Sequence, residues 1–282
     1  MGSSGEMHSP RQNKNKEDMS NTINNTLTQL FATKNEGLLN IYFTAGYPRL
    51  EDTRTVLKAL QDAGADMVEI GIPFSDPLAD GPTIQDSNDV ALNNGITLKK
   101  IIQQLKGMRE EITIPVVVMG YINSAIQYGV EKLAQDLHEL GVDGMIFPDL
   151  PVDEYKEKYQ ALFESLNLSM IFLVTPQTSD ERMNYIDEAS SGFIYIVSTA
   201  STTGNEAKAL DNGQQAYFER IKKASLKNPT MIGFNIKDHA SYSNACQYAN
   251  GAIIGSAFIK MLGNSHLLEK DIKEFVSFVK QG

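Results

Sequence analysis

Residues 38–72 read LLNIYFTAGYPRLEDTRTVLKALQDAGADMVEIGI, and this stretch predicts a strand, a helix and a second strand. The apolar runs 38–44 and 67–72 have the length and composition of buried strands. Between them, apolar side chains recur at helical spacing, at Val56, Leu57, Leu60 and Ala63. Two strands joined by a helix run parallel, so the stretch predicts the βαβ unit of an α/β fold.

The same unit repeats to the end of the chain. Six further strands are predicted, at 115–120, 143–148, 169–174, 193–197, 230–234 and 251–255. A second helical stripe runs through Val130, Leu133, Ala134, Leu137 and Leu140. Three glycines directly before strands are predicted to end helices as left-handed caps: Gly64, Gly141 and Gly251.

Eight such units predict one (β/α)8 TIM barrel over residues 23–282, because that fold typically takes about 250 residues. An open, doubly wound sheet is the alternative, and periodicity alone leaves it open. Eight evenly spaced units favour the barrel. The chemistry of a barrel lies at the carboxyl ends of its strands.

Composition narrows the class of protein. The 282 residues are 41% hydrophobic and 21% charged, which is typical of a globular chain. There are 25 basic and 35 acidic residues, a net charge of −10, which disfavours nucleic acid and anionic membranes as partners. The one cysteine excludes an internal disulfide, and no apolar run approaches the roughly 20 residues that span a bilayer. We therefore expect a cytoplasmic protein.

The first 22 residues differ from the rest. Residues 1–22 are polar, begin with Met-Gly-Ser-Ser and carry no apolar signal segment. We expect a flexible leader or an expression tag there, with Met19 as a plausible native start. The predicted catalytic domain therefore begins at residue 23.

Two carboxylates stand out in the second unit. Glu69 lies between Val68 and Ile70 in the strand, so alternation turns it into the barrel, where burial raises a carboxyl pKa and suits it to proton transfer. The alternative is a barrel-lining glutamate paired with a lysine or arginine. Asp80 follows in a loop stiffened by prolines, where a turn former beside glycine is the simpler interpretation, as it is for Asp76.

The run EIGIPFSDPLADGPTIQ at 69–85 resembles the tryptophan synthase alpha subunit family. Further matching segments are FTAGYP at 43–48, MGYIN at 119–123, DLP at 149–151, Thr203-Gly204 and GSA at 255–257. The resemblance extends from about Leu27 to the C-terminus. It implies a TIM-barrel lyase of L-tryptophan biosynthesis.

The family cleaves indole-3-glycerol phosphate to indole and glyceraldehyde 3-phosphate by a retro-aldol reaction that uses neither a metal nor a Schiff base. By resemblance, Glu69 is the proton-transferring acid and base, and Asp80 accepts the indole N–H. The four histidines and one cysteine show no metal-ligand spacing, which agrees with a chain that carries no cofactor.

The resemblance also implies a substrate pocket. Tyr42, where the family usually has Phe, is expected to line the indole site together with Met119, Ile146 and Tyr195. Tyr121, Asn123 and Asp149 lie at strand ends and in the loops that follow. For the apolar members, packing of the barrel is the competing interpretation.

A phosphate site is predicted on separate physical grounds. An acidic protein binds an anion best with backbone N–H groups, and barrels commonly place that site in the loops after strands seven and eight. Those loops contain Gly233, Phe234, Asn235, Gly255 and Ser256, and the preceding loop contains Thr203 and Gly204.

Two loops depart from the family pattern. The family commonly has Gly-Phe-Gly where Asn235 stands here, and asparagine tolerates a positive φ better than most residues. Residues 198–204 read STASTTG where many relatives have Ser-Arg-Ser-Gly-Val-Thr-Gly. Phosphate affinity and lid closure are the properties that these changes affect.

The resemblance implies a partner, the pyridoxal-phosphate beta subunit, in an alpha2beta2 heterotetramer. Asp76, Pro77 and Asn123 are expected at that interface. Two other functions remain open. One is a phosphosugar isomerase, although no histidine lies at a predicted strand end; the other is a catalytically weak subunit that mainly activates the beta subunit.

Overall fold

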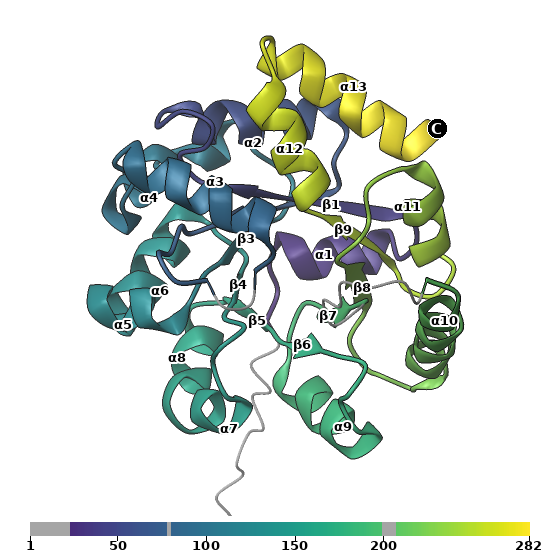
Figure 1. The fold of residues 1–282 in the computed structure, drawn as a ribbon. Helices are drawn as coiled ribbons and strands as arrows, with labels where there is room; N and C mark the ends of the chain where they lie inside the picture. The colour runs from purple at the N-terminus through teal and green to yellow at the C-terminus, as the bar shows by residue number, and fades with distance from the viewer. Residues whose placement is uncertain (1–22, 78–79, 199–206) are drawn as a thin grey trace, which may run out of the picture.

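The computed structural model describes residues 23–77, 80–198 and 207–282. The predicted leader, 1–22, lies outside the described residues. Figure 1 shows strands at the centre of the molecule and helices around them, which is the arrangement of a TIM barrel. Within the described residues no helix is long and apolar enough to cross a membrane.

All strand pairs of the sheet are parallel, in the order β5-β4-β3-β2-β1-β9-β8-β7-β6. The strands are β1 Leu38–Thr44, β2 Met67–Gly71, β3 Val116–Met119, β4 Gly144–Ile146, β5 Ser169–Ile171, β6 Leu173–Val174, β7 Ile194–Val197, β8 Thr230–Gly233 and β9 Gly251–Ile254. Each predicted strand is therefore present, with ends displaced by at most two residues.

The fifth predicted strand closes the barrel, and it does so in two pieces. Its first half, β5, pairs with β4, and its second half, β6, pairs with β7. At Phe172, between the halves, the carbonyl accepts a hydrogen bond from Tyr195 N at 3.0 Å. One predicted strand thus supplies both edges of the sheet, and the nine observed segments form the predicted eight-stranded barrel.

The helices lie around the outside of the strands (Figure 1), apart from α1, whose Leu27 packs into the barrel interior. They are α1 Thr26–Thr33, α2 Asp52–Ala63, α3 Pro82–Asn93, α4 Leu98–Leu105, α5 Ile122–Tyr128, α6 Val130–Leu140, α7 Val152–Glu154, α8 Gln160–Ser165, α9 Asp180–Ala189, α10 Ala207–Lys223, α11 His239–Ala245, α12 Ser256–Asn264 and α13 Leu268–Gln281. A 3-10 turn spans Met108–Glu110, and a π-helical turn spans Tyr155–Tyr159.

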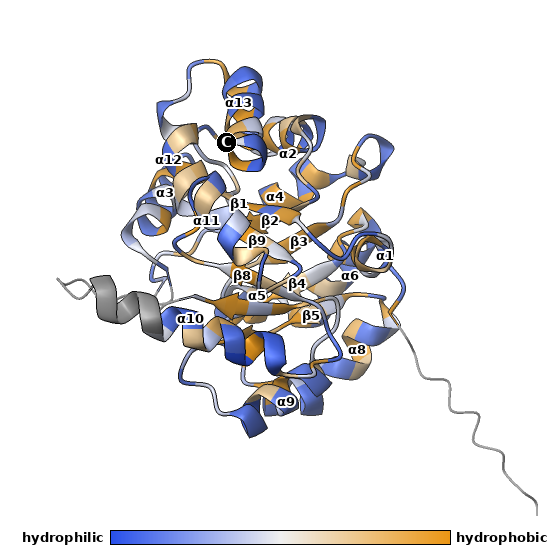
Figure 2. Cartoon of the chain, turned by 90° about the vertical axis from the view of Figure 1, so that its right-hand side faces the viewer, coloured by the Kyte–Doolittle hydropathy of each residue, from blue (hydrophilic) through white to orange (hydrophobic). Residues whose placement is uncertain are grey.

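Apolar side chains form two buried clusters. The larger one lies between the sheet and the helices and contains Val56, Leu57 and Leu60 of α2 and the apolar stripe of α6. The smaller one fills the barrel, where α1 adds Leu27 to residues that point inward from the strands. In Figure 2 the strands are mostly orange and most helices mix orange with blue, as expected for helices that bury one face.

Two of the three predicted glycine caps are confirmed. Gly64 ends α2 with φ 92° and Gly141 ends α6 with φ 77°, both in the left-handed conformation. The prediction for Gly251 was wrong, because α11 ends at Ala245 and Gly251 is the first residue of β9. A Cβ at Gly251 would lie 2.2 Å from the carbonyl oxygen of Leu38, so glycine there lets β1 and β9 approach.

The first and last described elements both contact the amino end of the barrel. Asn25, the N-cap of α1, donates to the carbonyls of Asp143 and Asn167, at 2.7 and 3.0 Å, just before β4 and β5. Lys280 of α13 donates to the carbonyl of Gly64, at 2.6 Å, just before β2. The carboxyl ends of the strands, where the predicted site lies, are at the opposite end.

Candidate active site

Glu69 lies inside the barrel, fully buried, as alternation along β2 predicted. Its strand neighbours Val68 and Ile70 point outward into the cluster under the helices. Asn40 of β1 donates from Nδ2 to Glu69 Oε2 at 3.2 Å. Glu69 Oε1 has no hydrogen-bond partner among the described residues.

Burial makes Glu69 a weak acid. Loss of hydration raises its pKa from the usual 4.5 to about 8, the hydrogen bond from Asn40 opposes this rise, and the nearby charge of Asp80 adds to it. Glu69 is therefore mostly protonated at neutral pH. A carboxyl group with a pKa near neutrality can both give and take a proton during turnover.

Asp80 lies in the loop after β2, and its side chain reaches the same site. Tyr121, at the end of β3, donates its hydroxyl to Asp80 Oδ2 at 3.1 Å. Burial raises the pKa of Asp80, and the hydrogen bond from Tyr121 opposes the rise by favouring the carboxylate. The loop is tied to α3, because Gln85 donates to the carbonyl of Asp80 at 2.8 Å.

Two tyrosines complete the polar interior. Tyr42 of β1 stands directly opposite Glu69 in the sheet, and Tyr195 projects inward from β7. Burial raises both phenol pKa values, and the charges of Glu69 and Asp80 raise them further. The two carboxyl groups and the two phenols therefore share one site.

Glycines at two strand ends make room for these rings. A Cβ at Gly71 would lie 2.1 Å from the Tyr42 hydroxyl oxygen, and one at Gly233 would lie 2.3 Å from the Tyr195 hydroxyl oxygen. Since real Cβ atoms do not approach so closely, any other residue at either position displaces the tyrosine. Gly233 thus has a packing role in addition to its predicted place in the phosphate loop.

The loop after β8 has the predicted unusual backbone. Phe234 and Asn235 have φ values of 67° and 58°, so the turn is left-handed at both residues and Asn235 adopts the conformation expected of it. Ser198 Oγ donates to the carbonyl of Phe234 at 2.6 Å, and Phe234 packs edge-on against Tyr195 with ring centroids 6.1 Å apart.

The loop after β9 leads directly into a helix. Gly255 is the N-cap of α12, and Ser256 is its first residue and is exposed. The first backbone N–H groups of α12, a helix of nine residues, have no partner within the helix, so its N-terminus can bind an anion. The other predicted phosphate contacts, Thr203 and Gly204, lie outside the described residues.

The remaining predicted pocket residues differ in exposure. Ile146 is fully buried in the interior cluster, and Met119 at the end of β3 is partly buried against both clusters. Asp149 is exposed and accepts a hydrogen bond from the backbone N–H of Ile122 at 2.9 Å. Of this group, Met119 is the residue that combines a strand-end position with partial exposure.

The residues expected at a partner interface lie near the same strand ends. Asp76 and Asn123 are exposed, in the loop after β2 and in α5. Pro77 is buried, so it supports the loop from within. Beside Asn123, Ile126 exposes 54% of its surface, which is unusual for a large apolar side chain.

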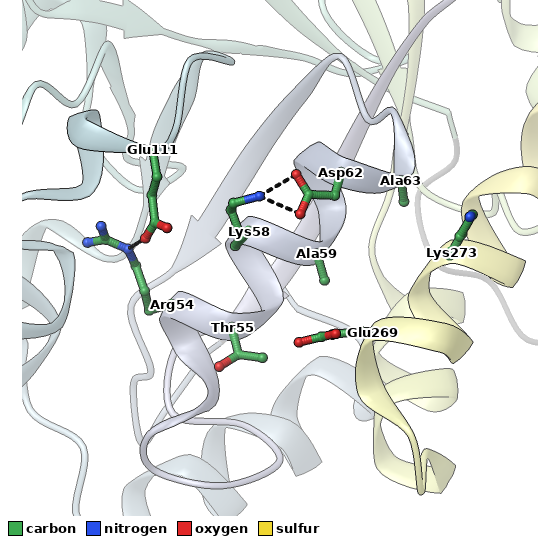
Figure 3. Close-up of a pocket in the computed structure, with 9 residues that line it drawn as sticks. All are labelled: Arg54, Thr55, Lys58, Ala59, Asp62, Ala63, Glu111, Glu269 and Lys273. Carbon is green, nitrogen blue, oxygen red and sulfur yellow. Dashed lines mark hydrogen bonds and ion pairs between the residues drawn. The ribbon is translucent and has the colours of Figure 1, made fainter.

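A groove of about 470 Å³ lies elsewhere, between α2 and α13 (Figure 3). Its charged side chains include the ion pairs Arg54–Glu111 and Lys58–Asp62. None of the predicted site residues lines it. Among the described residues no group of three or more His, Cys, Asp or Glu side chains could hold a metal ion.

Sequence reasoning missed several residues of the site, most of them polar. Asn40 was read only as part of an apolar strand, although its inward position follows from alternation with Tyr42. Thr44 and Ser87 were missed as well: Thr44 Oγ1 lies 3.4 Å from the Tyr42 hydroxyl oxygen and 2.7 Å from Ser87 Oγ. Phe74, which stacks on Tyr121 at 5.0 Å, follows from no local pattern.

Comparison with known proteins shows the family of this chain. A sequence profile described as "Tryptophan synthase alpha chain" matches residues 28–281. The chain belongs to the tryptophan synthase alpha chain family. The tryptophan synthase alpha chain of Christiangramia forsetii is 54% identical over 244 residues, which cover 86% of this chain and 93% of the relative. That of Flavobacterium johnsoniae is 50% identical over 256 residues, 91% of this chain and all of the relative.

Solved structures agree with the fold. Tryptophan synthase from Mycobacterium tuberculosis, in its aminoacrylate-bound form, contains a chain with a TM-score of 0.79 and 30% identity, covering 91% of this chain and 98% of its own. Tryptophan synthase subunit alpha from Legionella pneumophila has a TM-score of 0.77 and 33% identity, over 91% and 95%. The alpha-chain barrel is therefore shared along nearly the whole described chain.

Proposed function

We propose that this tryptophan synthase alpha chain cleaves indole-3-glycerol phosphate to indole and glyceraldehyde 3-phosphate, with Glu69 and Asp80 as its catalytic residues. The observation that carries the proposal is the convergence of these two carboxyl groups inside the mouth of the barrel, in different environments. Two such groups can divide acid–base work from charge stabilisation.

Glu69 has the properties of the proton carrier. With a pKa of about 8 it is mostly protonated at neutral pH and can donate its proton to C3 of the indole ring. The resulting carboxylate then takes the proton of the hydroxyl on the adjacent side-chain carbon. As the carbonyl of glyceraldehyde 3-phosphate forms, the carbon–carbon bond breaks and its electrons return to the indole ring, leaving Glu69 protonated again.

Asp80 stabilises the intermediate of this sequence. Protonation at C3 places positive charge on the indole ring, which a carboxylate beside the ring N–H offsets through a charge-assisted hydrogen bond. The Tyr121 hydroxyl holds Asp80 Oδ2 in place and favours its ionised form. Asp80→Asn should therefore lower kcat at least 10²-fold, whereas Asp89→Asn, an exposed change on α3, should leave kcat unaltered.

The substrate lies, in this proposal, between the tyrosines and the two anion-binding loops. Tyr42, Met119, Tyr121, Ile146 and Tyr195 surround the indole ring. The phosphate binds to the backbone of Gly233, Phe234, Asn235, Gly255 and Ser256, together with Thr203 and Gly204. The left-handed turn at 234–235 and the N-terminus of α12 support this assignment.

The chain acts without a cofactor of its own, and its partner is the pyridoxal-phosphate beta subunit in an alpha2beta2 assembly. The loop 73–82 and the segment 123–128 form the contact, because the described residues of both lie at the mouth from which indole leaves. The exposed side chains of Asp76, Asn123 and Ile126 support this surface, and Pro77 stiffens it. The sequence has one cysteine and therefore cannot form an internal disulfide, which supports a cytoplasmic location.

The deciding experiment measures indole release by the chain alone. Purified protein is incubated with indole-3-glycerol phosphate, and free indole and glyceraldehyde 3-phosphate are quantified against Glu69→Gln. We expect equal amounts of both products and a loss of 10²- to 10⁴-fold in the variant, since the amide has the shape of the acid but carries no transferable proton. Near wild-type activity of Glu69→Gln would falsify the assignment, and no release by the wild-type chain alone would favour a mainly activating subunit.

A further inference from the structure

Inside the barrel two buried polar side chains form a pair, and the proposed reaction gives a role to only one of them. Asn40 of β1 and Glu69 of β2 are both completely buried, and Asn40 Nδ2 donates to Glu69 Oε2 at 3.2 Å. In the register of the two strands, Asn40 stands opposite Met67 and Tyr42 stands opposite Glu69. Asn40 therefore lies one layer below Glu69, on the side away from the mouth.

The hydrogen bond from the Asn40 amide matters to Glu69 because of the other titratable groups that face this carboxyl group. They are Asp80 in the loop after β2, Tyr42 on β1 and Tyr195 on β7, with Tyr121 at the end of β3 bound to Asp80. None of these groups carries positive charge, and no ion pair of Glu69 is found within residues 23–77, 80–198 and 207–282. In that part of the chain, Asn40 supplies the hydrogen bond that the carboxyl group accepts.

The two remaining oxygens of the pair are unpartnered in the described chain. Glu69 Oε1 and Asn40 Oδ1 are both buried and both lack a hydrogen bond. One oxygen of the carboxyl group is thus held from below, while the other makes no hydrogen bond within the described residues. A buried polar atom without a partner costs free energy, which is tolerated where a bound substrate supplies the missing contact.

An amide suits a carboxyl group that changes its protonation state. Asn40 donates from Nδ2 to the carboxylate and, after rotation of the amide, accepts at Oδ1 from the protonated acid. A lysine or arginine in its place would hold Glu69 ionised, and a leucine would leave Oε2 without a partner. Among side chains of this size, asparagine serves both states of a proton carrier.

We propose that Asn40 is a positioning residue for the lyase reaction, which fixes Glu69 through Oε2 and leaves Oε1 directed to the substrate. This inference rests on the proposed role of Glu69. Because Asn40 lies below Glu69, on the side away from the mouth, we expect its effect on kcat rather than on KM.

The proposal has a consequence for pH dependence. Burial raises the pKa of Glu69 and the hydrogen bond from Asn40 lowers it, because a donor stabilises the carboxylate more than the neutral acid. Activity that starts from protonated Glu69 declines as the pH rises through about 8. Without the amide, this decline begins at a higher pH.

The test uses Asn40→Leu, which keeps the branched shape, and Asn40→Val, which a strand accommodates readily, so that one failure to fold leaves the other variant. Steady-state kinetics from pH 6 to 10 should show the alkaline decline of kcat displaced upward by roughly one pH unit. At pH 7, kcat should fall about tenfold while KM stays within twofold. Asn40→Gln, which retains the amide, should recover part of kcat.

A matched control separates positioning from general loosening of the barrel. Ser169 is another fully buried polar residue of the barrel, at the amino end of β5, where it contacts Asn25. Ser169→Ala should lower the free energy of unfolding without moving the pH profile. A carbon-13 NMR titration of the labelled Glu69 carboxyl group reports its pKa without requiring turnover and should show the same upward displacement in Asn40→Leu.

The outcomes distinguish this inference from the proposed function. If Glu69→Gln abolishes indole release but Asn40→Leu and Asn40→Val keep kcat within threefold and the wild-type pH profile, Asn40 is only a packing residue. If Glu69→Gln itself retains activity, the proposed function fails first. A displaced pH profile in both Asn40 variants, with unchanged KM, supports the positioning role.

Discussion

The burial of Glu69 opposes stability while it favours proton transfer. The folded chain holds a proton at Glu69 up to about pH 8, whereas the unfolded chain releases it near pH 4.5. Between these values the native state binds more protons than the unfolded state, so this group lowers the free energy of unfolding as the pH rises. The slope is at most about 1.4 kcal/mol per pH unit.

Glu69→Gln should remove this dependence. We expect the variant to gain stability relative to the wild type as the pH is raised from 5 to 8, because glutamine is never ionised. Urea unfolding of both proteins at several pH values measures the difference, in which all shared groups cancel. A difference that stays constant over this range would mean that Glu69 is ionised in the folded chain.

A second single-residue prediction concerns Asn235 in the predicted phosphate loop. It adopts a φ of 58°, which glycine takes without strain. We expect Asn235→Gly to leave the KM for indole-3-glycerol phosphate equal or lower, since removal of Cβ relieves crowding around the phosphate. Steady-state kinetics decide the matter, and a large rise in KM would show instead that the asparagine side chain contacts the substrate.

At the scale of the elements, two glycines in helices predict opposite changes in stability when each is replaced by alanine. Gly64 ends α2 with φ 92° and has open space around its missing Cβ, so Gly64→Ala meets no clash and pays only the backbone cost, about 1–2 kcal/mol. Gly213 lies within α10, exposed and also in open space, so Gly213→Ala should stabilise by about 0.5–1 kcal/mol. Thermal unfolding of the two variants should move in opposite directions.

The same elements show why most of the barrel could be predicted. Strands such as β1 and helices such as α2 carry their own apolar period, and a left-handed glycine such as Gly64 is a local property of a helix end. The interruption at Phe172 and the true role of Gly251 depend instead on which strands pair and how closely. Pairing is a non-local property, which single-sequence patterns do not contain.

In the candidate site, too, some residues could be predicted from the sequence and others could not. Alternation placed Glu69 inside the barrel, and the resemblance singled out Asp80, so both carboxylates were predicted. Asn40 was missed because its significance lies across the sheet, two residues out of register with Glu69. The family roles of the pocket residues stay predictions.

For the molecule as a whole, the mouth of the barrel and its opposite end offer a matched test of the partner surface. Ile126 and Phe278 expose similar fractions, 54% and 52%, but Ile126 lies in α5 beside the mouth and Phe278 in α13 near Lys280, which contacts the amino end of the barrel. We expect Ile126→Asp to weaken association with a beta subunit at least tenfold, because it buries an unpaired charge.

Phe278→Asp should leave that association intact. Sedimentation measures complex formation, and indole release measured during titration of the beta subunit should rise with complex formation. If both variants bind equally well, the contact lies elsewhere. If the wild-type chain forms no complex and its turnover is unchanged, it acts alone.

The placement of Asn25 and Lys280 at the amino end of the barrel has a practical consequence for anyone who wishes to immobilise this catalyst. A carrier protein, an affinity handle or a solid support joined next to α1 or after α13 is attached on the side away from the substrate entrance. An attachment at either of these two elements therefore leaves the mouth of the barrel facing the solution, where indole can be collected as it is released.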